Sequence, residues 1–146
     1  MKAFIYFIAL ISMCACDIPL RHMEPESQIS NAVGNIVPLG KTLNVEIIWH
    51  KGPFGLPNKA SFLEVRLLDQ NLNLTSTSEG DQFYIQADMG MGHGLANAGD
   101  FYGNEDLNIW INDTLSFYMG GNYLLKLYLF DENFNELGVA EWRVVF

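Results

Sequence analysis

Residues 43–50 read Leu-Asn-Val-Glu-Ile-Ile-Trp-His, and this stretch decides the fold class. Apolar and polar residues alternate along it with a period of two. Successive side chains of a β-strand point to opposite faces, so the period predicts a strand with one face toward a core. The residues expected on the core side are Leu43, Val45, Ile47 and Trp49.

The same alternation recurs along the rest of the chain. It is found in residues 62–67, 83–88, 107–112, 115–119, 123–130 and 140–146. Turn-forming residues separate these segments, for example at 69–73, 120–121 and 131–133. No segment shows the period of an amphipathic helix. About seven short strands with frequent turns predict an all-β protein, an immunoglobulin-like β-sandwich without the Cys-Trp-Cys pattern of antibody domains.

Composition agrees with one globular domain. The chain has 146 residues, of which 49% are hydrophobic, enough for one packed core. Its formal net charge of -9 does not favour nucleic acid as a partner, because phosphate-binding proteins need clustered positive charge.

The N-terminal segment, MKAFIYFIALISMCAC, predicts export. A lysine precedes an apolar run that is too short for a comfortable membrane span, as in secretory signal peptides. Its end resembles a bacterial lipobox, with Ala15 before the lipid acceptor Cys16, and Cys14 is the alternative acceptor. Two other interpretations stay open, an uncleaved apolar anchor and an ordinary secreted protein. The preferred one is a lipoprotein anchored to a membrane of the bacterial cell envelope and facing the periplasm or the exterior.

These features divide the chain into three parts. Residues 1–16 are expected to be the lipoprotein signal peptide, and residues 17–35, which are polar and aperiodic, a flexible tether. Residues 36–146 are expected to form the β-sandwich domain.

One segment carries residues suited to metal chemistry. Residues 88–94 read Asp-Met-Gly-Met-Gly-His-Gly, which places Met89, Met91 and His93 at alternate positions. In an extended backbone these three side chains point the same way. Thioether and imidazole form a soft ligand set that favours copper as Cu(I). If the turn at 119–121 meets this loop, Met119 becomes a fourth candidate ligand.

A second interpretation of the same residues needs no metal. Met89 is in phase with the core residues Phe83 and Ile85, and methionine fills gaps in protein cores. Met119 is then a core residue at a hairpin end, and His93 is a solvated loop residue.

Met-Gly-His-Gly at 91–94, followed by Met-Gly-Gly at 119–121 and an aliphatic strand, resembles the YtkA-like domain and, more loosely, FixH-like proteins. Trp-His-Lys-Gly-Pro at 49–53 also fits, and the resemblance covers about residues 38–146. It implies an exported immunoglobulin-like sandwich linked to copper handling and to cytochrome oxidase assembly, with Met89, Met91, His93 and Met119 as copper ligands. One departure is Gly90, since family members often have proline there.

Two functional hypotheses follow. The first is an envelope lipoprotein that binds Cu(I) through the Met/His set and passes it to a partner such as a respiratory oxidase subunit. The second is an interaction or scaffold module of the cell envelope, for which Trp110 and Tyr118 are candidate contact residues because they are expected on outward-facing positions. We do not expect an enzyme, because the sequence shows no recognisable nucleophile–base pair or hydrolytic zinc pattern.

Overall fold

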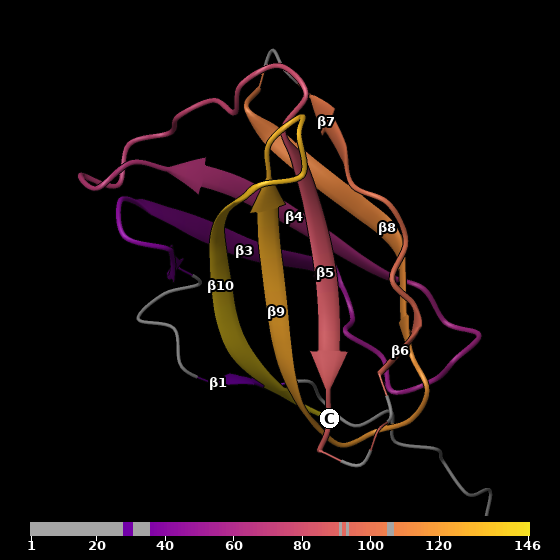
Figure 1. The fold of residues 1–146 in the computed structure, drawn as a ribbon. Helices are drawn as coiled ribbons and strands as arrows, with labels where there is room; N and C mark the ends of the chain where they lie inside the picture. The colour runs from indigo at the N-terminus through magenta and orange to yellow at the C-terminus, as the bar shows by residue number, and fades with distance from the viewer. Residues whose placement is uncertain (1–27, 31–35, 91, 93, 105–106) are drawn as a thin grey trace, which may run out of the picture.

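The computed structural model describes residues 28–30, 36–90, 92, 94–104 and 107–146, and in this part of the chain all regular structure is β-strand (Figure 1). The strands are β1 (Gln28–Ser30), β2 (Ile36–Leu39), β3 (Leu43–Lys51), β4 (Ser61–Leu68), β5 (Gln82–Asp88), β6 (Leu95–Asn97), β7 (Tyr102–Asn104), β8 (Ile109–Phe117), β9 (Asn122–Phe130) and β10 (Glu136–Val145). The predicted all-β class is confirmed.

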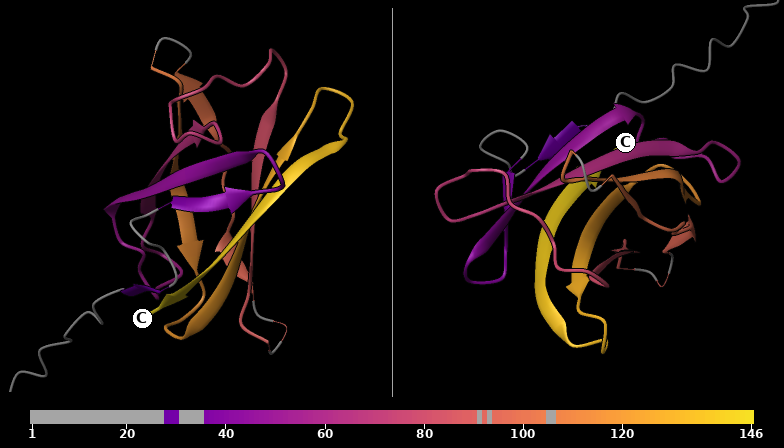
Figure 2. Two further views of the ribbon diagram at one scale, coloured as in Figure 1. Left: turned by 90° about the vertical axis from the view of Figure 1, so that its left-hand side faces the viewer. Right: turned by 90° about the horizontal axis from the view of Figure 1, so that it is seen from above.

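The strands form two antiparallel sheets that face each other across one core (Figure 2). One sheet has four strands in the order β1-β10-β9-β5. The other has the order β2-β3-β4-β8-β6, with β7 also pairing to β8. Both sheets contribute alternate residues to the core, as a sandwich requires. The largest fully buried side chains are Trp142, Tyr123, Phe117, Leu39, Ile47, Leu63, Ile85, Leu115, Leu125, Leu127, Leu129 and Val45.

The strand count differs from the expected seven for two reasons. Four strands of three or four residues, β1, β2, β6 and β7, are too short to show a period. Conversely, the two segments expected at 107–112 and 115–119 are parts of one strand, β8. β1 lies within the segment expected as a tether and pairs with β10.

A bulge in β8 explains how one strand contains the two segments that the sequence predicts as separate. Leu63 of β4 pairs with Asn112, and Ser61 pairs with Leu115, so β8 has one extra residue between the two pairs. A bulge of this kind shifts the phase of the side chains beyond it. Asn112 and Leu115 are therefore both buried although they are three residues apart.

The phase of β8 corrects the expected position of Trp110. Trp110 pairs with the core residue Val65 and packs edge-on against Phe83, with 5.4 Å between the ring centroids. It therefore points into the sandwich and not outward. Tyr118, the other aromatic candidate for a partner contact, is exposed.

Two of the expected turns have the same hydrogen-bond arrangement. In residues 69–73 and 131–135 an aspartate Oδ1 accepts the backbone N–H groups two and four residues on, over 2.8–2.9 Å. These hydrogen bonds, with those from the Asn73 and Asn135 side chains, hold the pKa of Asp69 and Asp131 below its usual range. They fix Leu72 and Phe134 at φ values of 64° and 61°, in the left-handed region that apolar residues seldom adopt.

Candidate functional site

The two methionine-bearing segments meet at one end of the sandwich. Met89 follows β5 directly, is half-buried, and packs against the core. A Cβ atom built on Gly121 would lie 3.0 Å from Met89 Cε, so the methyl group of Met89 lies against the turn between β8 and β9. We call this end, formed by Met89, residues 118–121, Gly55 and Phe146, the rim.

Met119 is exposed on that turn, with 47% of its surface accessible. Its backbone carbonyl accepts a hydrogen bond from Tyr123 Oη over 3.1 Å. Burial of Tyr123 raises the pKa of its hydroxyl, so the hydroxyl keeps the proton that it donates. A thioether on a turn fixed in this way is accessible from solvent without rearrangement of the backbone.

Close backbone contacts hold the turn in place. A Cβ atom on Gly55 would lie 2.5 Å from Gly120 N, and the Phe146 N–H donates to the Gly121 carbonyl over 3.0 Å. The Phe146 ring stacks on Tyr123 at 5.5 Å. The turn is thus clamped between the loop after β3 and the last residue of the chain.

The conformation of Gly90 explains why glycine suits this position better than proline. Gly90 has a φ of 79°, and its N–H donates to Asp88 Oδ1 over 2.6 Å. Proline fixes φ near −65° and has no N–H to donate, so it fits neither feature.

The structure describes only some of the predicted copper ligands, and it places these in different surroundings. Met91 and His93 lie outside the described residues, as do both lipidation candidates, Cys16 and Cys14. Met119 is exposed at the rim, which the core interpretation did not expect. Met89 packs on the core, as that interpretation did expect, although its methyl group contacts the turn that carries Met119.

Other groups that bind metals give no cluster in the part of the chain that is described. Its histidine, cysteine, aspartate and glutamate side chains do not gather in sets of three or more that could hold an ion. The described residues also include no helix of the length and apolarity needed to cross a membrane.

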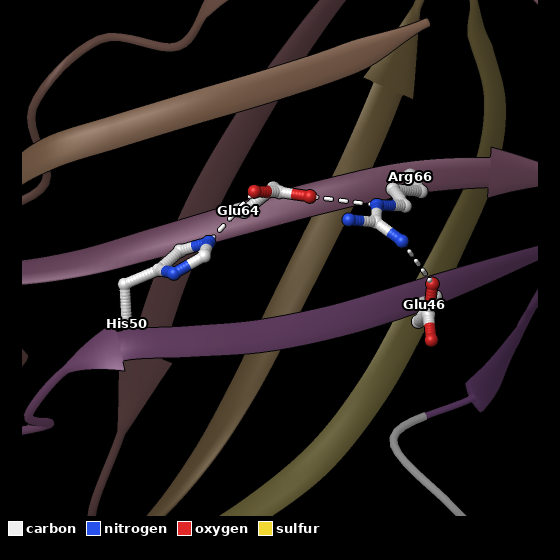
Figure 3. A network of polar contacts seen from close by, with 4 residues as sticks. All are labelled: Glu46, His50, Glu64 and Arg66. Atoms are coloured by element: carbon white, nitrogen blue, oxygen red, sulfur yellow. Dashed lines mark hydrogen bonds and ion pairs between the residues drawn. The ribbon is translucent and has the colours of Figure 1, made fainter. Parts of the chain in front are cut away.

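A second polar arrangement, which the sequence did not reveal, lies on the six-stranded sheet (Figure 3). Glu64 of β4 is nearly buried, and its carboxylate accepts hydrogen bonds from His50 Nε2 over 2.7 Å and from Arg66 Nε over 2.6 Å. Arg66 Nη1 lies 3.4 Å from Glu46 Oε2. The sequence showed that Glu46 alternates with core residues. It did not show that the pairing of β3 with β4 brings Glu46 next to Arg66 and Glu64.

Glu64 should make stability depend on pH. Burial alone would raise the pKa of Glu64, but the hydrogen bonds from His50 and Arg66 and the charge of Arg66 outweigh it and hold the pKa below its ordinary value of 4.5. A carboxyl group with a lowered pKa stabilises the fold above its unfolded-state pKa, and this contribution is lost as the pH falls through the folded-state value.

We therefore expect the Glu64→Gln variant to unfold at a lower temperature than the wild type near pH 7, with a difference that shrinks below about pH 4.5. Thermal unfolding by circular dichroism between about pH 7 and pH 3 measures this difference. Glu141→Gln is the control, because Glu141 pairs with Lys126 at the surface and a surface pair contributes little. A difference between Glu64→Gln and wild type that stays constant with pH would contradict the assigned role of the carboxylate.

No protein-family model, curated protein or solved structure matches this chain. The resemblance to the YtkA-like domain, with the immunoglobulin-like connectivity that it implies, therefore stays a prediction.

Proposed function

We propose that this protein is an envelope lipoprotein that binds Cu(I) at the rim and passes it to a membrane or envelope partner such as a respiratory oxidase subunit. The observation that carries the proposal is the contact of Met89 Cε with Gly121. It brings the start of the Met-Gly-Met-Gly-His loop against the turn that bears Met119. Two segments more than 25 residues apart thus supply soft ligands to one end of the domain.

The residues at the rim have separate roles in this proposal. Met119 supplies an accessible thioether on a fixed turn, and Met91 and His93 supply a second thioether and an imidazole from the loop. Met89, packed on the core, attaches the loop to the turn and adds its sulfur where the loop permits. Transfer to a partner is ligand exchange, in which the partner's donors replace these one by one without bond chemistry.

Titration of residues 17–146 with Cu(I) against a chromophoric chelator tests the proposal. This fragment keeps every described core residue, since the core lies between Val37 and Phe146. We expect one Cu(I) per chain, with His93→Ala, Met91→Leu and Met119→Leu each raising the dissociation constant at least about tenfold, because each removes one donor of a small soft ligand set.

His22→Ala and Met23→Leu are the matched controls, because they remove the same side-chain types outside the predicted ligand set. Both should bind as the wild type does. Failure of the protein to compete with the chelator would exclude the copper function.

The second candidate function is a non-metal interaction module of the cell envelope. It is supported by the packing of Met89 against the core and by the exposure of Tyr118 beside Met119. In this case the rim is an apolar contact surface. The same titration would then show no Cu(I) binding, and the Met119→Leu variant would behave as the wild type does.

A further inference from the structure

One edge of the four-stranded sheet lacks the protection that the other edges have. Edge strands expose unpaired backbone groups, and proteins usually shield them by shortness, proline, lysine or bulges. β1, β6 and β7 have three residues each, and β2 has four with the exposed Pro38. β5 has seven residues, no proline, lysine or arginine, and a regular register with β9.

Within the described residues no strand pairs with the other side of β5, although β6 lies near it and the Phe101 ring packs on Phe83 with 5.9 Å between the ring centroids. A Cβ atom on Gly94 would lie 3.2 Å from the Ala87 carbonyl oxygen, so the loop after β5 covers the Ala87 end. We call the rest of the strand, Gln82 to Gln86, the accessible part, because its outward side chains are exposed, and its midpoint is Tyr84.

The accessible part is nearly the same in both directions. It reads Gln-Phe-Tyr-Ile-Gln, so an antiparallel copy centred on Tyr84 sets tyrosine against tyrosine, Phe83 against Ile85, and Gln82 against Gln86. The two inward residues are buried in the core, and the other three are exposed. With a two-fold axis through the midpoint, the core-facing residues of one copy therefore lie opposite core-facing residues of the other, and exposed residues lie opposite exposed residues.

We propose that two copies of this chain pair through β5 about this axis, which joins the two four-stranded sheets into one eight-stranded sheet. Tyr84 lies 6.4 Å from Tyr128, which stacks on Phe130 at 5.8 Å. The pairing would join this aromatic row to its copy across the axis. Glutamine opposite glutamine sets amide donors and acceptors against each other and creates no pair of like charges.

The dimer should be weak. A strand pair of five residues is a small interface, and two chains of net charge -9 repel each other. We expect a dissociation constant on the order of 100 µM at moderate salt, lowered by added salt.

Sedimentation equilibrium on residues 17–146, from about 10 µM to about 1 mM, tests the proposal with two double variants. Gln82→Lys with Gln86→Lys sets lysine against lysine twice across the axis, and should raise the dissociation constant about tenfold. Gln82→Lys with Gln86→Glu sets opposite charges against each other, and should dimerise at least as tightly as the wild type.

The net charge of the variants separates general repulsion from repulsion across the axis. Residues 17–146 lack Lys2 and have a net charge of -10 (-9 - 1), which the double-lysine variant changes to -8 (-10 + 2), so general repulsion falls while the expected dimerisation weakens. A wild type that is monomeric at about 1 mM, or a double-lysine variant that dimerises as the wild type does, would overturn the proposal.

Cross-linking tests the position of the axis. Directly opposed residues of antiparallel strands have Cα atoms about 4.5–5.5 Å apart, within the range of a disulfide. The fragment 17–146 contains no native cysteine. Under oxidation Tyr84→Cys should give a covalent dimer at least about tenfold faster than Tyr118→Cys, an exposed site outside β5. Equal rates would place the contact elsewhere and overturn the register.

Discussion

Replacing Trp142 by alanine is expected to lower the free energy of unfolding by about 4 kcal/mol, the largest single effect in this chain. Trp142 lies in the middle of β10, is 1% exposed, and is the largest fully buried side chain among the described residues. Removal of the indole forfeits its burial and leaves a cavity that the two sheets, fixed by their hydrogen bonds, can only partly close.

Trp142→Phe is the matched comparison. In the described part of the protein the Trp142 indole Nε1 is buried without a hydrogen-bond partner. Phenylalanine keeps a ring in the core and removes this unpaired N–H, so we expect a loss below about 2 kcal/mol. Urea unfolding should be followed by circular dichroism, since the substitutions change fluorescence. Equal losses for the two variants would show that the indole N–H makes a contact that stabilises the fold.

The next largest effect is expected at the bulge of β8. Asn112 is fully buried and holds the bulge from within. Its Nδ2 donates to the Ala98 carbonyl over 2.7 Å, and its Oδ1 accepts the Thr114 N–H over 3.2 Å. Asn112→Leu preserves the approximate size of the side chain but removes both hydrogen bonds. We expect a loss of about 3 kcal/mol in urea unfolding, because the Ala98 carbonyl and the Thr114 N–H lose their partner and leucine at this buried position cannot replace it.

The same substitution at Asn97 provides the control. Asn97 is exposed, and its side chain bonds the Thr114 carbonyl and the Gly99 N–H in the same region. Water can replace these hydrogen bonds, so Asn97→Leu should cost below about 1 kcal/mol. If both variants lost stability equally, the stabilising effect would belong to the loop as a whole and not to the buried amide.

Alternation in the sequence predicted most of the core. The expected core positions of β3, of residues 63–67 and of residues 83–87 lie in or against it. These strands pair with their neighbours at a regular register over those residues, so the period of two persists.

The predicted inward and outward positions were wrong in the first part of β8, residues 109–112, where the pairing with β4 overrides the local sequence pattern. Asn112 followed the apolar Ile111 and was expected at the polar, outward phase, yet the extra residue of the bulge turns it into the core. Trp110 is inward for the same reason. A bulge depends on the pairing with β4, which lies more than 40 residues earlier in the sequence, so no local pattern reveals it.

The candidate site was predictable in part. The spacing of the methionines and His93 identified the loop and the turn as chemically related segments, and the structure places Met89 against that turn. The buried carboxylate of Glu64 was not foreseen, because charged residues on strands are usually solvated and only the register of β3 with β4 brings His50 and Arg66 to it.

The pairing of β1 with β10 brings the N-terminal end of the described domain to the rim. Gln28 lies opposite Val145, so the chain enters the domain beside Phe146, at the rim. If Cys16 carries lipid, only 12 residues (28 − 16) separate the acyl chains from this entry point. A fully extended segment of that length spans at most about 40 Å. In the proposed function, the lipid anchor would therefore keep the rim, and Met119 with it, within about 40 Å of the bilayer, a distance that the extramembrane domain of a copper-receiving partner could span.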